Sequence, residues 1–231
     1  LDWLSIDDVL NTGYCYMLME QDQPTAALGF IENSQGIFWI QFFYSKAPYE
    51  RIEERWNVLY SYAKLQLHLH RLIIASIPTT KQFEKILYAN GFRFFENFLF
   101  LECHRSTDNG PVEQIPSMSI RNMRLNDVDS IAVLCDISFP PFWKLSKKNI
   151  INAFEQSDFA IVVENEEKEI IGYLLAVTEN HSAHLSRIAV NPSVQNTGLG
   201  FTLINLFFRH YQKLGIMDFS VNTPSRNQAA L

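Results

Sequence analysis

The stretch Ile188-Ala189-Val190-Asn191-Pro192-Ser193-Val194-Gln195-Asn196-Thr197-Gly198-Leu199-Gly200 decides the fold, because a strand breaks there at a proline and enters a helix through a glycine-spaced turn. The first N–H groups of a helix have no partner within the helix and lie at the positive end of its dipole. These groups suit a pyrophosphate without any basic side chain. A side chain at Gly198 or Gly200 would keep the phosphates away from the amides or clash in the turn. The stretch therefore predicts a phosphate site built from backbone.

Composition limits the size of the protein and its partners. The chain has 231 residues, of which 47% are hydrophobic, and this is enough for two packed domains. Its formal net charge of −6 argues against a surface that neutralises many phosphates, so we expect no nucleic-acid partner. No apolar run approaches the roughly 20 residues that span a bilayer, and no basic-then-apolar leader opens the chain. We therefore expect a cytoplasmic protein without a membrane partner.

The cysteines give no sign of disulfides or of a metal site. Cys15, Cys103 and Cys135 have no paired spacing and no nearby Cys/His ligand set. We expect reduced structural thiols and no metal.

Two halves of similar order follow one another along the chain. In the second half, periodicity predicts strands at 119–123, 159–164, 169–178, 183–190 and 216–221, and helices at 126–137, 146–156 and from the glycines to 215. In the first half it predicts strands at 14–20, 26–31, 36–44, 72–77 and 92–103, and helices at 49–67 and 80–89. We therefore expect an α+β fold with two domains, at 1–104 and 118–231, and a polar linker at 105–117.

The pattern V-x-P-x-x-Q-x-x-G-x-G, which runs from Val190 to Gly200 between a strand and a helix, resembles motif A of the Gcn5-related N-acetyltransferase (GNAT) superfamily. Asn227 and Ala230 fit the N-x-x-A start of that family's next motif. The three glycines of a Rossmann fingerprint after a first strand, and the Gly-Lys-Ser/Thr of a P-loop, do not occur. The resemblance covers 119–231, and the first half as a degenerate repeat. It implies two tandem acyl-CoA N-acyltransferase folds, each a mostly antiparallel sheet flanked by helices.

The resemblance also implies the co-substrate and the reaction. Members of the family bind acetyl-CoA with its pantetheine arm in a gap between two splayed strands, and an amine attacks the thioester directly, without a metal. By position, the resemblance implies coenzyme A contacts at Ile188, Ala189, Val190, Gln195, Asn196, Thr197, Gly198, Leu199, Gly200, Phe201 and Asn227. We expect an acetyl-CoA-dependent N-acetyltransferase acting on a primary amine of a small molecule or peptide. The alternative is a non-catalytic acyl-CoA-binding sensor.

The resemblance makes His184 the first candidate for the general base, because it stands six residues before Val190, where the histone-acetylating branch of the family carries a glutamate. A histidine titrates near neutral pH, which suits accepting a proton from an amine. The alternative interpretation makes it a solvated turn residue. Glu179 and Ser186 are the reserve candidates. The family's usual acid is a tyrosine on the helix that Asn227 begins, and it is not assigned because the sequence stops at Leu231. Either the natural protein continues and completes that helix and the last two strands, or this half is incomplete and its exposed sheet edge is covered in another way. We expect the first.

The acceptor side and the first half complete the predictions. Phe139, Phe142 and Trp143 form either an acceptor-binding wall or a plug at the edge of the core. Aligning Pro48 with Pro192 puts Arg51, Glu54 and Trp56 where Gln195, Gly198 and Gly200 stand. Bulk and negative charge at that turn would repel a pyrophosphate, so we expect no coenzyme A in the first half.

Overall fold

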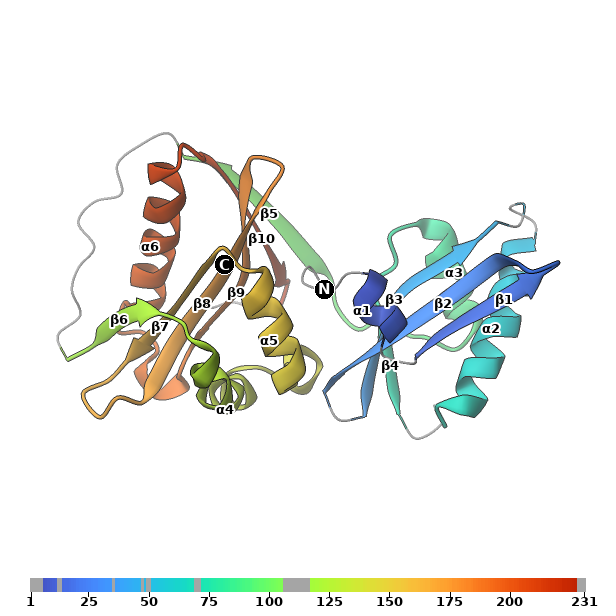
Figure 1. Ribbon diagram of the computed structural model, residues 1–231, viewed down its shortest axis with the longest axis horizontal. Coiled ribbons are helices and arrows are strands. Elements are labelled where there is room, and N and C mark those ends of the chain that lie inside the picture. Colours follow the sequence, from blue (N-terminus) through green and yellow to red (C-terminus); the bar gives the residue numbers. More distant parts are fainter. Residues whose placement is uncertain are drawn as a thin grey trace. The chain divides into compact units, whose positions relative to one another are not determined.

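The computed structural model describes residues 6–11, 14–34, 36–46, 48, 51–68, 72–105 and 117–227. The chain forms two compact units, one ending at Phe95 and the other beginning at Glu96 (Figure 1). Each unit contains one sheet with helices packed on it, which confirms the predicted α+β class. Across the described ranges, no helix is both long enough and apolar enough to cross a membrane.

The first unit holds a four-stranded sheet in the order β1-β2-β3-β4, in which β3 and β4 run parallel and the other pairs antiparallel. Its elements are α1 (Ile6–Asn11), β1 (Cys15–Glu20), β2 (Gln23–Ser34), β3 (Ile37–Ser45), α2 (Ile52–Gln66), β4 (Ile73–Ser76) and α3 (Lys81–Ala89). Helix α2 buries Trp56 completely, with its ring edge-on to Phe43 of β3 and Phe83 of α3. This aromatic contact joins both helices to the sheet.

The second unit holds a six-stranded sheet in the order β5-β10-β9-β8-β7-β6. Its elements are β5 (Phe98–His104), β6 (Ser119–Asn122), α4 (Val128–Ser138), α5 (Lys147–Gln156), β7 (Phe159–Glu164), β8 (Ile170–Glu179), β9 (Ser182–Val190), α6 (Leu199–Lys213) and β10 (Asp218–Pro224), with 3₁₀ turns η3 (Leu125–Asp127), η4 (Pro141–Trp143) and η5 (Pro192–Val194). Only β9 and β10 run parallel. All the strands predicted in this half are present, with ends shifted by a few residues.

Strand β5 lies in the second sheet, although the sequence analysis assigned its residues to a first domain ending at 104. It pairs with β10 along its whole length, from Phe98 opposite Pro224 to His104 opposite Asp218. The compact units accordingly divide before it, between Phe95 and Glu96. The alternation of aromatic residues predicts a strand but does not identify its partner, because strand pairing is set by contacts distant in sequence.

Helices cover both faces of the second sheet, α6 on one side and α4 with α5 on the other (Figure 1). The α6 side is a continuous apolar core, in which Leu203 and Phe207 pack with Ala183 and Leu185 of β9. Because side chains alternate along a strand, the residues between these point to the α4 side. Buried His184 is therefore on the α4 face of β9. Buried Arg187 is on the same face because an extra residue, Ser186, interrupts the alternation, and its Nη2 donates to Cys135 of α4.

An ion-pair network ties the start of α4 to the sheet. The guanidinium of Arg121 on β6 donates two hydrogen bonds to Asp127, at 2.7 and 2.8 Å, and also pairs with Glu164 of β7 at 2.6 Å. Asp127 accepts the backbone N–H of Arg124 as well, at 2.7 Å. Hydrogen bonds from Arg121 are the main reason that the pKa values of Asp127 and Glu164 lie below their ordinary range.

This network makes the stability of the second unit depend on pH. Because the native pKa values of both carboxyls are lowered, the stabilisation is complete above their ordinary pKa of about 4 and is lost as the pH falls through the native values. We expect Arg121→Met to lower the free energy of unfolding by about 2 kcal/mol at pH 7 and by much less near pH 3. Urea unfolding at the two pH values measures this. The control is Lys168→Met, since Lys168 is 71% exposed and 3.7 Å from Glu164. An equal loss from Arg121→Met at both pH values would contradict the assignment.

Candidate active site

A gap between β9 and β10 is the main feature of the second sheet. The two parallel strands pair only as far as Leu185 and Val221. Strand β9 nevertheless continues to Val190 and β10 to Pro224. Within the described part of the chain, β9 beyond Leu185 is paired on its β8 side alone. The backbone groups of Ser186–Val190 that face β10 can therefore bind an extended ligand as a further strand would.

A β-bulge at Ser186 explains where the gap begins. Consecutive residues Leu175 and Ala176 of β8 pair with Arg187 and Leu185 of β9, so that Ser186 is the extra residue. A bulge bends its strand and increases the local twist. The bend comes directly after the last residue of β9 that pairs with β10, and it turns the rest of the strand away from its neighbour.

The connection from β9 to α6 is held by its own side chains. Gln195 donates from Nε2 to the carbonyl of Val190 at 3.2 Å, and the Thr197 hydroxyl donates to the carbonyl of Val194 at 2.8 Å. The loop enters α6 through Gly198, whose φ of +87° lies in the left-handed region. A glycine adopts this conformation without strain, and other L-residues do so at a cost.

The first turn of α6 fits a bound phosphate group. A Cβ atom at Gly200 would meet no protein atom within 4 Å, so protein packing does not require glycine there. The open space lies beside amides that have no acceptor within the helix, where a pyrophosphate would be bound. The Leu199 side chain is buried in the core, so only its backbone can reach such a ligand, while Phe201 is 73% exposed. Asn196 has a φ of +63°, which turns the loop towards the helix.

The acetyltransferase (GNAT) family model matches residues 128–231. This match includes the bulge, the gap and the glycine turn. The second unit is a GNAT domain. A search of curated proteins finds no match.

Solved structures show that the likeness in fold extends over nearly the whole chain. A GCN5-related N-acetyltransferase from Sphaerobacter thermophilus aligns over 97% of this chain and 78% of its own, with a TM-score of 0.64 and 12% identity. A tandem GNAT protein from the clavulanic acid biosynthesis pathway aligns over 94% and 77%, with a TM-score of 0.62 and 10% identity. A GNAT-family acetyltransferase from Colwellia psychrerythraea aligns over 99% and 81%, with a TM-score of 0.55 and 12% identity. At such identities the likeness shows the fold, and it confirms the predicted tandem arrangement of two GNAT folds.

His184 lies on β9 of the GNAT domain, two residues before the bulge. Its side chain is 3% exposed, and Nδ1 is 2.8 Å from the hydroxyl oxygen of Ser220, its cross-strand partner on β10. The interpretation as a solvated turn residue is therefore wrong. If Nδ1–H donates to Ser220, the lone pair lies on Nε2, and this is the tautomer that a base acting through Nε2 requires.

The other predicted residues lie at separate places. Glu179 is exposed at the β8–β9 hairpin, where it pairs with Ser182, about 13 Å along the strand from the bulge. Ser186, the bulge residue, is half-buried. Asn227 is exposed in the turn after β10 and donates from Nδ2 to Thr223 at 3.1 Å. Ala230 lies outside the described residues.

The aromatic loop after α4 contacts β9. Phe139, Phe142 and Trp143 are all half-buried, which fits both the acceptor wall and the core plug. The guanidinium carbon of Arg187 lies 3.9 Å from the centre of the Phe139 ring, and its Nη2 donates to the carbonyl of Trp143. Sequence reasoning missed Arg187, although a charged residue within an apolar strand is a signal that could have indicated it.

The first unit has a comparable bulge, but β4 ends where its pairing with β3 ends, and no glycine lies at the start of α2. Its parallel strands β3 and β4 pair only as far as Ile40 and Ser76, and Gln41 forms a bulge at that point. Helix α2, however, has Arg51 at its N-cap, in the place of Gly198. The alignment on Pro48, which put Glu54 there, is corrected because the connection from β3 to α2 is shorter than that from β9 to α6.

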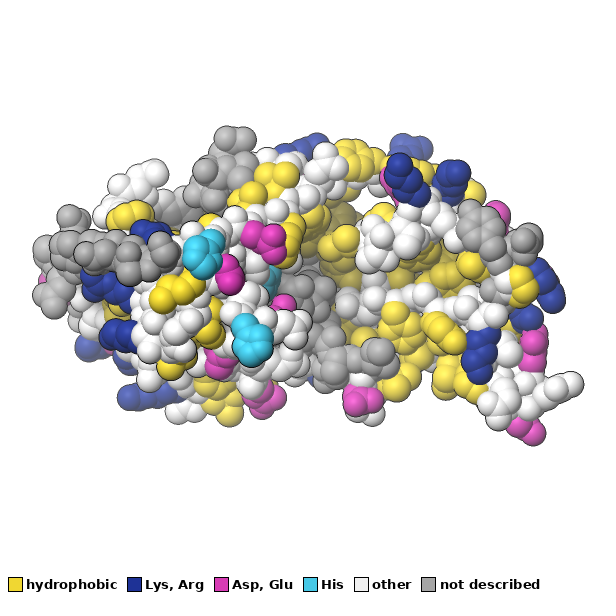
Figure 2. Space-filling view, turned by 90° about the horizontal axis from the view of Figure 1, so that it is seen from above, with side chains coloured by type: hydrophobic (Ala, Val, Ile, Leu, Met, Phe, Trp, Pro, Cys, Tyr) yellow, Lys and Arg dark blue, Asp and Glu magenta, His cyan; other side chains and the backbone are white. Residues whose placement is uncertain are grey.

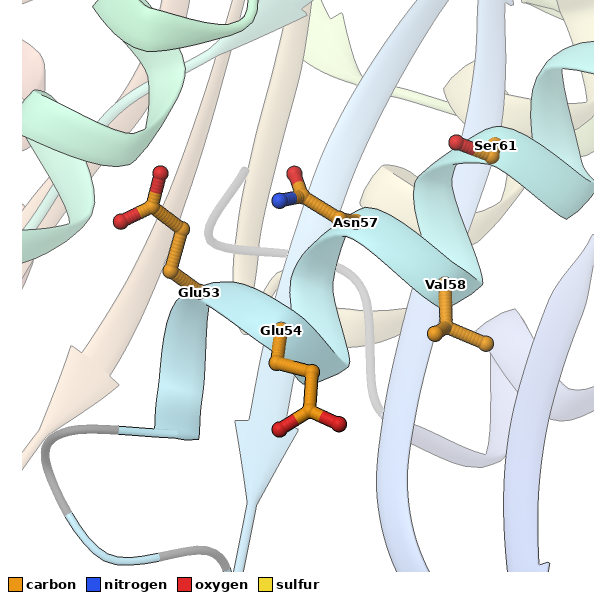
Figure 3. Close-up of a pocket in the computed structure, with 5 residues that line it drawn as sticks. All are labelled: Glu53, Glu54, Asn57, Val58 and Ser61. Carbon is orange, nitrogen blue, oxygen red and sulfur yellow. The ribbon is translucent and has the colours of Figure 1, made fainter.

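The first turns of α2 are acidic. Figure 3 shows Glu53 and Glu54 projecting from the start of α2, beside a shallow hollow that also involves Asn57, Val58 and Ser61. Arg51 is already paired with Glu54 at 3.0 Å. Two carboxylates at a helix start stabilise the helix and oppose a bound phosphate.

The described residues include no group of three His, Cys, Asp or Glu side chains that could hold a metal ion. The face shown in Figure 2 carries Lys and Arg side chains in separate groups with acidic side chains among them.

We expect Gly198→Ala to lower the free energy of unfolding by about 1 to 2 kcal/mol, because alanine is strained at a positive φ. Gly200→Ala is the matched control two residues on. It meets no atom and gains helix propensity, so stability is unchanged or higher. Urea unfolding of the two variants measures the difference. Equal stability of both would show that the turn relaxes without strain.

Proposed function

We propose that this protein is an acetyl-CoA-dependent N-acetyltransferase that acetylates a primary amine of a small molecule or peptide. The observation that carries the proposal is the coincidence of three features: the ladder between β9 and β10 ends, β9 bulges, and the same strand leads into the glycine turn of α6. An extended donor with a pyrophosphate at one end matches this order of sites. Membership of the GNAT family supports acyl transfer from an acyl-CoA in general.

The residues of this chain have separate tasks in the proposed reaction. The first-turn amides of α6, from Leu199 to Phe201, bind the pyrophosphate, and the backbone of Ser186–Val190 holds the pantetheine arm. Acetyl-CoA supplies a thioester as the acyl donor. The amine forms the C–N bond as the C–S bond breaks, and coenzyme A leaves as its thiolate, which takes up a proton from solvent. The proton that leaves the amine passes to His184 or to water that His184 orients.

Binding of coenzyme A by the second unit alone is the first test. We expect one site per chain in isothermal titration calorimetry with coenzyme A. Gly200→Asp should weaken binding by about 100-fold, because a carboxylate then faces the phosphates. It should not destabilise the fold, since an acidic residue is favourable in the first turn of a helix.

Gly200→Asn is the matched control, because it has nearly the same shape without the charge, and it should retain more affinity than Gly200→Asp. Equal affinity of Gly200→Asp and the wild type would contradict the proposed pyrophosphate site. Two sites per chain would contradict the assignment of binding to the second unit alone.

Turnover separates the enzyme from the acyl-CoA-binding sensor. Release of coenzyme A should be followed by chromatography over a panel of amines, because the exposed Cys103 would react with thiol reagents. Binding without turnover of any amine would favour the sensor.

His184→Gln tests the base. We expect kcat/KM to fall by about 100-fold or more and its pH profile to lose the acidic limb, while the Kd for coenzyme A stays within about twofold. Ser220→Ala is the control, because it removes only the hydrogen-bond partner and should keep the limb. An unchanged acidic limb in His184→Gln would exclude the role.

A further inference from the structure

Arg187 is a buried cation next to the bulge of β9. It is 9% exposed, and its Nε donates to the Tyr173 hydroxyl at 3.0 Å. Its Nη2 donates to the Cys135 sulfur at 3.4 Å and to the carbonyl of Trp143, and its guanidinium lies over the Phe139 ring. Burial raises the pKa of Tyr173 to about 12, so this partner stays neutral. None of the carboxylates in the described ranges forms an ion pair with Arg187.

A buried cation that contacts only neutral groups is unusual in a protein core. Burying a charge without a countercharge is costly, so a residue that serves only to fill the core is more often apolar. Arg121 shows the ordinary arrangement in the same unit, because it faces two carboxylates, Asp127 and Glu164. The groups that Arg187 contacts therefore indicate why a cation is buried at this position.

The partners of Arg187 are the two ends of the aromatic loop. Phe139 and Trp143 flank the stiff Pro140–Pro141 pair, and one guanidinium contacts both. Cys135 also holds this loop, because its sulfur accepts the backbone N–H of Leu145 at 3.3 Å as well. The loop is thus fastened to β9 at the residue after the bulge.

Trp143 also contacts the first residue of β5 and a residue just before it. Its ring is edge-on to Phe98 at 4.8 Å, and Nε1 donates to Glu96 at 3.4 Å. Trp143 therefore lies between the residue that follows the bulge and the edge strand of the sheet. If this loop forms an acceptor wall, the wall borders the region in which the acceptor amine would meet a donor bound between β9 and β10.

We propose that Arg187 is a positioning residue that holds the loop from Phe139 to Trp143 against the bulge as the acceptor wall. This inference rests on the proposed function for its consequence in catalysis. The planar guanidinium can stack on a ring and donate to a carbonyl at the same time, whereas lysine offers a single charged point. Loss of Arg187 should release the loop without changing the donor site on α6.

The experiment uses the full chain labelled with 5-fluorotryptophan, with the Trp143 signal in the ¹⁹F spectrum assigned by comparison with Trp143→Phe. We expect Arg187→Met to shift or broaden the Trp143 signal, and Arg187→Lys to give an intermediate effect. Arg121→Met is the control for general destabilisation and should leave the signal in place. With the best amine from the panel, the acceptor KM of Arg187→Met should rise about tenfold, while the Kd for coenzyme A stays within about twofold.

The outcomes separate this inference from the proposed function. An unchanged Trp143 signal in Arg187→Met, or the same change in Arg121→Met, would overturn the positioning role whether or not the protein is an enzyme. If no amine is acetylated but the Trp143 signal responds to Arg187→Met alone, the positioning role stands and the proposed function fails. If Arg187→Met does not fold, the comparison of Arg187→Lys with Arg121→Met decides.

Discussion

The extra residue at Ser186 is the constraint on which the rest of the second unit depends. Among the described residues, the ladder between β9 and β10 ends directly before this added residue, and the β9 backbone groups that follow it have no paired strand on that side. The same bend directs β9 towards the glycine turn and α6. Donor binding in the proposed function therefore depends on backbone geometry, and it does not require a net positive charge on the protein.

The two faces of this sheet differ in the kind of residue that they bury. The α6 face is an apolar core that fixes the helix whose first turn is the proposed phosphate site. The α4 face contains buried polar groups, namely His184 with Ser220 and Arg187 with Tyr173. Burying polar groups costs free energy unless hydrogen bonds compensate their desolvation, and His184 and Arg187 both have such partners beside the bulge.

The sequence was most informative where structure is local. The glycine turn, the strand before it and the helix after it depend on residues close in sequence, and all three lie where they were predicted. The placement of β5 and the contacts of Arg187 depend on partners far away in the chain, for which periodicity carries no signal. For the same reason Ser186 could be named as a candidate residue but not as a bulge, because a bulge is defined by the pairing of two strands. His184 illustrates the limit well: its residue type suggested a base, but its burial followed only from the strand on either side of it.

Strand β5 lies before the linker predicted at 105–117, but it pairs in the second sheet. A cut at that linker would therefore not separate the two sheets. Residues 118–231 taken alone would lack the strand that covers β10, and a row of backbone donors and acceptors along that edge would face water or a neighbouring chain. The edge strand next to β10 is thus β5, which lies in the segment between the first unit and the residues of the family match. A fragment that begins after the predicted linker would therefore expose the edge of β10, and one that keeps the sheet intact has to begin before β5.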